Sequence, residues 1–247
     1  MGRFTKWLGA GLGWSFGGPI GAVLGYLIAN AIEGFGKKDF QEFQRQAQGH
    51  SYNTHSGDFE VSLLLLSSFV IKADGKIDPR ELDFVRSYFV KMYGKDRANH
   101  AFRLFKGIIK SEAISPRQIC LQIQHQMQHA ARLQLMHYLF ALAKADEIVA
   151  PEELDMLHKI AGYLNINPRD FESIKAMFYS DSQSAYKILE IEKTATDQEV
   201  KAAYRKMVKK HHPDKLRHLG EEHLKGAQDK FLKIQEAYEQ VKKERNL

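Results

Sequence analysis

The feature that most constrains the fold is an uncharged stretch near the start of the chain. Trp7 to Ile32 spans 26 residues and contains no Asp, Glu, Lys, Arg or His. A helix needs about 20 apolar residues to cross the hydrocarbon core of a bilayer, so this stretch is long enough to do so. We therefore predict that residues 1–36 form a membrane anchor built on one transmembrane helix.

Glycines recur at every fourth position of this stretch, at Gly9, Gly13, Gly17, Gly21 and Gly25. On a helix they form one smooth stripe, and small residues of this kind let two membrane helices approach closely. In a soluble helix each glycine would instead cost about 1 kcal/mol relative to alanine. The pattern favours embedding in a membrane, and a homodimer paired through the stripe is a further hypothesis.

Two other interpretations of the N-terminal segment stay open. Arg3 and Lys6 precede the apolar run, and Ala29-Asn30-Ala31 has the small-x-small form of a signal-peptide cleavage site. A cleaved signal peptide is therefore the first alternative. The second is a glycine-rich flexible arm, which the absence of charges and the presence of Trp7 and Trp14 disfavour.

Composition limits the classes of protein open to the rest of the chain. Hydrophobic residues make up 44% of the sequence, which is enough to bury a core. Cys120 is the single cysteine, so neither an intrachain disulfide nor a cysteine-based zinc site can form, as is usual in a reducing compartment. The net charge of +6 suits an acidic partner or an anionic membrane face but is too small to predict nucleic-acid binding.

The middle of the chain predicts helices, and strand-like alternation is scarce throughout, so we expect an all-α fold. Residues 37–57 are typical of a juxtamembrane helix followed by a polar linker. Residues 58–180 indicate a bundle of about seven helices. Helix starts are marked by prolines at positions typical of a first turn, Pro79, Pro116, Pro151 and Pro168.

An internal repeat runs through this bundle. KADGKIDPREL (Lys72–Leu82) aligns with KADEIVAPEEL (Lys144–Leu154), and each copy lies between two apolar helical segments. The simplest architecture is a pair of pseudo-symmetric helical hairpins packed into one bundle. These motifs resemble the TerB domain, an all-helical module of tellurite-resistance and stress proteins.

Acidic residues of the two motifs allow two interpretations. The candidates for a weak divalent-cation site are Asp74, Asp78, Asp146 and Glu153. The interpretation we prefer is that Asp78 caps a helix and Glu81 reaches back to it, as in a capping box. His125 and His129 could also hold a metal from one helix face, but no third ligand is evident, so we expect them to be solvated.

The last third of the chain, residues 184–247, predicts three helices. A short first helix covers Ala185–Ile191, and Thr196 with Glu199 forms a capping box that starts the second. Pro213 ends the second helix, and a polar loop leads to the third. Cationic side chains project from the second helix, namely Lys201, Arg205, Lys206, Lys209 and Lys210.

This region closely resembles the J domain of DnaJ-type co-chaperones. The resemblance rests on EVKAAYRKMVKKHHPDK (Glu199–Lys215) and DKFLKIQEAYEQV (Asp229–Val241). The signature tripeptide of that family falls on His212, Pro213 and Asp214. An anchor, a TerB-like domain and a J domain, in that order, resemble the bacterial DjlA group.

The resemblance implies a partner and a mechanism. A J domain docks on an ATP-loaded DnaK-type chaperone, where the cationic helix would steer association and Asp214 would meet an arginine. Such a protein performs no bond chemistry, so we expect neither an enzyme nor a cofactor. The alternative function is a stress-response scaffold or metal-binding protein that acts mainly through the TerB-like domain.

The resemblance also implies a location. DnaK-type chaperones and ATP are cytosolic, so the domains after the anchor would be cytoplasmic and the short N-terminus outside. The expected site is therefore the bacterial inner (cytoplasmic) membrane, crossed once.

Overall fold

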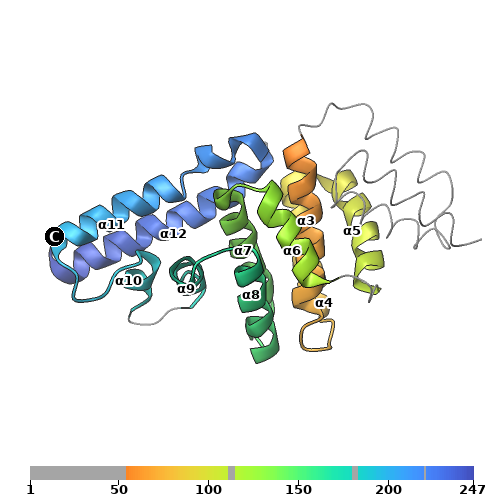
Figure 1. Ribbon diagram of the computed structural model, residues 1–247, viewed down its shortest axis with the longest axis horizontal. Coiled ribbons are helices and arrows are strands. Elements are labelled where there is room, and N and C mark those ends of the chain that lie inside the picture. Colours follow the sequence, from red (N-terminus) through yellow and green to blue (C-terminus); the bar gives the residue numbers. More distant parts are fainter. Residues whose placement is uncertain (1–53, 111–114, 180–182, 220) are drawn as a thin grey trace, which may run out of the picture.

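The computed structural model describes residues 54–110, 115–179, 183–219 and 221–247, and all regular structure in these ranges is helical (Figure 1). The all-α prediction is confirmed for this part of the chain. The predicted anchor, its glycine stripe and most of the predicted linker lie outside the described residues.

Seven helices form the bundle, as the sequence predicted for the part of it described here: α3 (Thr54–Ile71), α4 (Pro79–Tyr93), α5 (Lys95–Lys110), α6 (Pro116–Gln126), α7 (His129–Ala143), α8 (Pro151–Tyr163) and α9 (Pro168–Ala176). The four prolines occupy the first turns of α4, α6, α8 and α9. Helix α3 begins at Thr54, inside the segment predicted as a linker.

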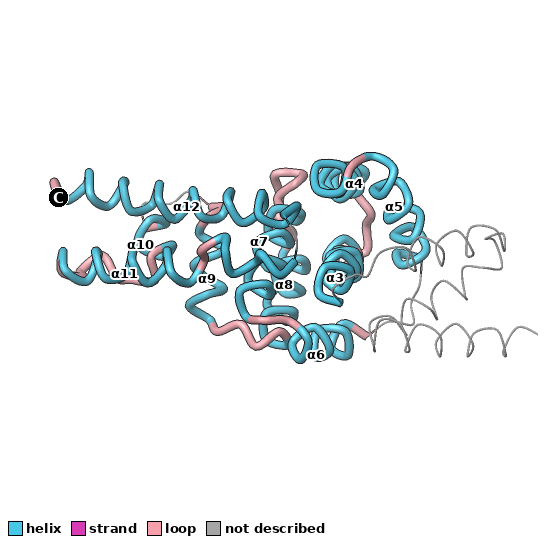
Figure 2. The backbone as a smooth tube through the Cα atoms, turned by 90° about the horizontal axis from the view of Figure 1, so that it is seen from above, coloured by secondary structure: helices cyan, strands magenta, loops and turns pink. Residues whose placement is uncertain are grey.

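Helices α3 and α7 form the middle of the bundle and are apolar on nearly every side. Leu63 and Leu66 on α3, and Leu135 and Leu139 on α7, are fully buried. A helix that is hydrophobic all round must be surrounded by others. Figure 2 shows α3 with α4, α5 and α6 around it, while α7 and α8 lie on its remaining side.

The two repeated motifs form equivalent connections, from α3 to α4 and from α7 to α8. They lie side by side, because Arg80 on α4 donates to the backbone oxygen of Asp146 at 3.3 Å. The predicted repeat therefore corresponds to two helical hairpins of one bundle.

The last third forms α10 (Ser184–Ile188), α11 (Asp197–Lys210), the 3₁₀ helix η1 (Pro213–Leu219) and α12 (Glu221–Arg245). Helices α11 and α12 lie antiparallel and bury apolar residues between them, including Val200, Met207 and Ile234 (Figure 1). The rings of Tyr204 and Tyr238 stack across the pair with centroids 4.0 Å apart.

Two details of this region differ from the prediction. The first helix ends at Ile188, three residues early, with Glu190 in a left-handed turn at a φ of 60°. The segment after Pro213 is η1 and not a polar loop, because Leu216 and Leu219 are buried. The two leucines are three residues apart, which is the period of a 3₁₀ helix, so both point to one side.

Candidate functional site

Helix α11 starts at the predicted capping box. The Thr196 hydroxyl accepts from the backbone N–H of Glu199 at 3.3 Å, and the Glu199 carboxylate accepts from the backbone N–H of Thr196 at 2.7 Å. These bonds satisfy donors that a helix start leaves free. They also fix where α11 starts, and so the direction in which its basic side chains point.

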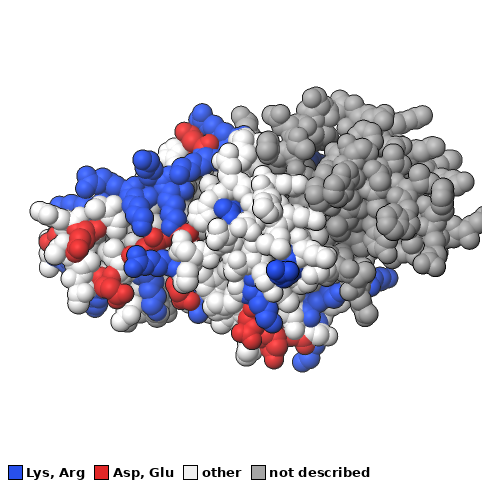
Figure 3. All heavy atoms as spheres, viewed as in Figure 1, with Lys and Arg blue, Asp and Glu red and all other residues white. Residues whose placement is uncertain are grey.

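Most of those basic side chains lie on the surface. Lys201, Arg205, Lys206 and Lys209 are exposed, and Figure 3 shows Lys and Arg gathered over α11. We call Lys201, Arg205 and Lys209 the outer cations. A concentration of one charge on a helix raises the local concentration of an oppositely charged partner, in a salt-dependent way.

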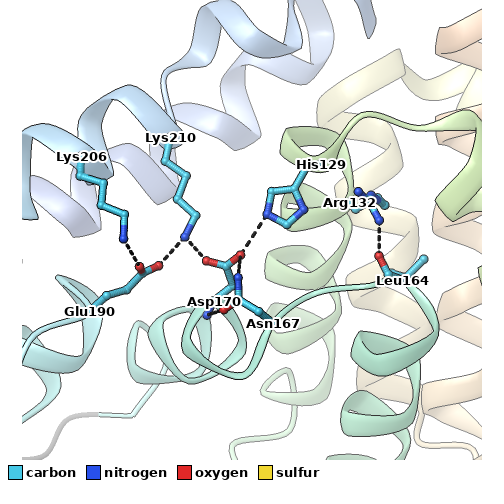
Figure 4. A network of polar contacts seen from close by, with 8 residues as sticks. All are labelled: His129, Arg132, Leu164, Asn167, Asp170, Glu190, Lys206 and Lys210. Atoms are coloured by element: carbon cyan, nitrogen blue, oxygen red, sulfur yellow. Dashed lines mark hydrogen bonds and ion pairs between the residues drawn. The ribbon is translucent and has the colours of Figure 1, made fainter.

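Lys210 differs from the other predicted docking cations. Its side chain is only 19% exposed, and its ammonium pairs with Asp170 of α9 and, at 2.5 Å, with Glu190 (Figure 4). Lys206 also reaches Glu190, at 3.3 Å, but stays 65% exposed. Lys210 therefore holds the end of α11 to the bundle, whereas the sequence predicted that it would face a partner.

The His-Pro-Asp tripeptide lies at the junction of α11 and η1. The side chains of His212 and Asp214 are 47% and 55% exposed. The backbone N–H of Asp214 donates to His212 Nδ1 at 3.3 Å, and its carboxylate pairs with Arg217 Nε at 3.0 Å. The tripeptide thus presents an ionisable carboxylate to solvent at the end of a cationic helix.

The bundle holds this junction from the other side. Leu216 and Leu219 of η1 are 2% and 1% exposed and belong to the same apolar core as α3 and α7. Sequence reasoning missed this contact. The signal was available in the spacing of the two leucines, but nothing in the sequence indicated which surface they would meet.

Asp170 is the centre of a polar network beside this junction (Figure 4). It is 1% exposed, and its Oδ2 lies 2.9 Å from both His129 Nε2 and Asn167 Nδ2, while Oδ1 pairs with Lys210. Burial acts to raise the pKa of Asp170, but the hydrogen bonds from His129 and Lys210 outweigh it and lower that pKa. The group is therefore a buried carboxylate held in its charged form.

The structure confirms the predicted solvation of His125 and corrects the prediction in part for His129, whose side chain is 40% exposed. Helix α6 ends at Gln126 and α7 begins at His129, so His125 and His129 do not share a helix. His125 is exposed, and His129 contacts Asp170. No sequence pattern linked His129 on α7 with Asp170 on α9, because their contact depends on how the two helices pack.

Two further basic groups are buried near the network. Lys230 on α12 is 2% exposed, and burial lowers its pKa to about 7, with the charge of Asp170 opposing that effect. His211 is 5% exposed, its Nδ1 makes no hydrogen bond, and burial lowers its pKa as well. Burial therefore favours the neutral forms of both groups, beside the charged pair of Asp170 and Lys210.

The candidate cation ligands of the repeat have other partners. Asp78 caps α4, since its Oδ1 accepts from the backbone N–H of Arg80 at 2.8 Å, and Glu81 accepts from the Asp78 N–H at 3.3 Å, which confirms the capping interpretation. The Arg80 guanidinium lies 2.7 Å from Asp78 and 3.6 Å from Asp146. Asp74 accepts from the backbone N–H of Lys76 at 2.9 Å.

Glu153 occupies the position in the second motif that Glu81 has in the first. It accepts from the backbone N–H of Ala150 at 2.7 Å. Burial, followed by the charge of Glu153, raises the pKa of Glu81 to about 8, so the two carboxyls share a proton near neutral pH. In the described ranges, no three His, Cys, Asp or Glu side chains are grouped so that they could hold a metal ion.

Comparison with known protein families divides the chain into three. Residues 1–34 match the family described as the co-chaperone DjlA transmembrane domain, residues 60–176 match tellurite resistance protein TerB, and residues 184–246 match the DnaJ domain. In the part of the chain that the structure describes, no helix has the length and apolarity needed to cross a bilayer. The membrane-anchor match therefore rests on the sequence of the first 34 residues.

Curated relatives cover the whole chain. The co-chaperone protein DjlA of Coxiella burnetii is 27% identical over 100% of both chains, and that of Vibrio vulnificus is 30% identical over 80% of this chain and 82% of its own. The Shewanella oneidensis protein of the same name is 51% identical over 26% of this chain. No solved structure matches the chain. With a transmembrane domain, a TerB domain and a J domain in this order, the chain belongs to the DjlA family of DnaJ-type co-chaperones.

Proposed function

We propose that this co-chaperone recruits a DnaK-type chaperone to the membrane and stimulates its ATP hydrolysis. The observation that carries the proposal is the exposed Asp214 carboxylate, presented beside the outer cations on a junction whose other side is packed into the bundle. Exposure makes the group available to a partner, and packing restricts the conformations from which it is presented.

The outer cations act first. Lys201, Arg205 and Lys209 attract an acidic surface of the chaperone and raise the association rate, an effect that salt screens over about 10 Å at 0.1 M. Such exposed charges contribute more to the rate of encounter than to the lifetime of the complex.

Asp214 acts second. In the free chain it pairs with Arg217, three residues away and 72% exposed. An arginine of the chaperone can replace Arg217 and form a charge-assisted bond in a less solvated place, where it is stronger. If that bond exists only in the state of the chaperone that hydrolyses ATP, docking favours that state by differential binding. The co-chaperone itself breaks no bond and is not an enzyme.

The membrane arrangement follows from the partner. ATP and DnaK-type chaperones are cytosolic, so we place the TerB and J domains in the cytoplasm, with one crossing of the inner membrane and the N-terminus outside.

Pairing of anchors through Gly17 and Gly21 would make the protein a dimer. Replacing both glycines with leucine should then weaken association in detergent, and unchanged association would contradict the dimer.

The decisive experiment measures single-turnover ATP hydrolysis by a DnaK-type chaperone with the full-length protein in detergent. We expect Asp214→Asn to reduce stimulation about 10-fold or more, since a hydrogen bond to a charged group contributes about 1.5–3 kcal/mol. Asp197→Asn is the matched control, because Asp197 is 56% exposed on the same domain and also pairs with an arginine, Arg245. Equal activity of the two variants would overturn the proposal.

A further inference from the structure

The TerB and J domains share their cores. Leu216, Leu219 and Ala227 of the J domain are buried in the core of the bundle. In return, Ala176 and Met177 at the end of the bundle are buried in the core of the J domain. Neither apolar core is complete without side chains from the other domain, so removing either domain exposes buried surface of its neighbour.

A glycine on α12 marks how closely the domains approach. A Cβ added to Gly226 would lie 3.0 Å from both Gln134 Nε2 on α7 and Tyr88 Oη on α4. Glycine inside a helix costs about 1 kcal/mol relative to alanine, but a side chain at this position would press against both neighbours. By contrast, a Cβ at Gly162 on α8 would meet nothing within 4 Å.

A charge from the bundle completes the contact. Asp170 pairs with Lys210 at the end of α11, and its field favours the charged form of Lys230 on α12. His129 and Asn167, both of the bundle, hold the other oxygen of the same carboxylate. One buried bundle carboxylate thus interacts with a lysine on each long helix of the J domain, with Lys210 at the end of α11 that leads to η1 and with Lys230 in the first half of α12.

The contact leaves the docking surface uncovered. His212 and Asp214 stay about half exposed, and the outer cations are exposed, although η1 is packed against α3 and α7. The bundle therefore contacts the J domain on the side away from the exposed tripeptide and the outer cations. It can hold the tripeptide in place without competing with a partner.

We infer that Asp170 of the TerB domain is a positioning residue for the His-Pro-Asp loop, and that it acts by clamping Lys210 while Leu216 and Leu219 fix the far end of that loop. The inference deepens the proposed function and rests on it for its consequence in ATP hydrolysis. It assigns the TerB domain a direct part in the activity of the J domain.

The physical reason is that the contact with Asp170 restricts the conformations of the end of α11 and of η1. Without the Asp170 carboxylate, Lys210 loses its partner on the bundle and keeps Glu190 of its own domain, while Lys230 loses the charge that opposes its desolvation. The end of α11 and η1 then sample arrangements that cannot dock. A binding-competent state that is populated only in part lowers apparent affinity by that fraction, although a saturating partner still selects it.

The test uses the full-length protein in detergent and the variant Asp170→Asn, which preserves shape and removes the charge. The half-stimulating concentration of the co-chaperone should rise about 10-fold, with maximal ATP hydrolysis at saturation unchanged. In the absence of chaperone, hydrogen–deuterium exchange should speed up in Pro213–Leu219 and the last turn of α11, while α3 and α7 stay protected. Glu172→Gln, on the same helix with its side chain 49% exposed, is the matched control and should behave as the parent protein.

Lys210→Gln keeps the inference testable if Asp170→Asn unfolds the bundle. It removes the other partner from a position that is 19% exposed, and it should reproduce both effects. The double variant should be no worse than either single one, because both remove the same contact. Parent-like exchange and stimulation in Asp170→Asn would overturn the inference, and so would parent-like behaviour of Lys210→Gln or faster exchange spread over α3 and α7 in that variant. Failure of Asp214→Asn to reduce stimulation would sink the proposed function instead, and the exchange result would still decide on the clamp.

Discussion

The two sides of the J domain both carry basic side chains, but these are exposed on one side and buried on the other. On the outer side of α11, Lys201, Arg205 and Lys209 are exposed to solvent. On the side that meets the bundle, Lys210 is mostly buried against Asp170, and Lys230 is buried nearby. A pair of exposed charges contributes little to the free energy of unfolding. A buried charge that loses its partner lowers that free energy by several kcal/mol. The outer side is therefore suited to attracting a partner, and the inner side to fixing one arrangement of the domains.

Shortening a buried side chain of η1 should give the largest effect on stability, because it removes packing between η1 and the bundle. Leu219→Ala removes a side chain that is 1% exposed in the shared core, and such changes cost about 2–5 kcal/mol. For a protein of this size, in which 1 kcal/mol shifts the melting temperature by about 2–4 °C, we expect the apparent melting temperature of the full chain in detergent to fall by roughly 4–20 °C. Leu232→Ala is the control, since Leu232 on α12 is 52% exposed and should change it little. Equal shifts in the two variants would show that η1 is not packed as described.

Removal of the outer cations should affect association and not stability. With Lys201, Arg205 and Lys209 all replaced by glutamine, we expect the association rate with a DnaK-type chaperone to fall about 10–100-fold at low salt. The difference from the parent protein should vanish near 0.5 M salt, where screening has already removed the attraction. Stopped-flow association at several salt concentrations measures this. A change in melting temperature as large as that of Leu219→Ala would contradict the division between the two sides.

Titration of the buried lysine should give a smaller effect that depends on pH. The pKa of Lys230 is about 7 in the folded chain and 10.5 as its ordinary value, so between these pH values the unfolded chain binds a proton that the folded chain does not. Stability should therefore rise with pH in this window, by up to about 1.4 kcal/mol per unit, and lose this contribution as pH falls toward 7. Lys230→Met should flatten the slope of melting temperature against pH from 7.5 to 9.5. An unchanged slope would mean that Lys230 is solvated.

Local sequence patterns were sufficient wherever neighbours in the chain decide the structure. The prolines at first turns, the capping boxes at Asp78 and Thr196, and the apolar faces of α11 and α12 were all found as predicted. These features depend on contacts within a few residues, so the order of residue types is enough to predict them.

Patterns failed where two elements distant in the chain meet. The segment after Pro213 has mostly polar residues and was predicted as a loop, yet Leu216 and Leu219 bind it to the bundle as η1. Lys210 was grouped with the outer cations, because its position on α11 does not reveal that α9 supplies Asp170 at that side. The contact of His129 with Asp170 was missed for the same reason, although the His129 side chain stays 40% exposed.

The sequence by itself determined the all-α class, the order of three regions and the position of the His-Pro-Asp tripeptide. Periodicity, capping and an intact His212-Pro213-Asp214 motif are properties of adjacent residues. Tertiary structure alone decided that the TerB and J domains share a core and that Asp170 holds the inner side of the J domain. The physical reason is that a side chain's charge and shape are local, whereas its burial and its partners depend on which helices pack against it.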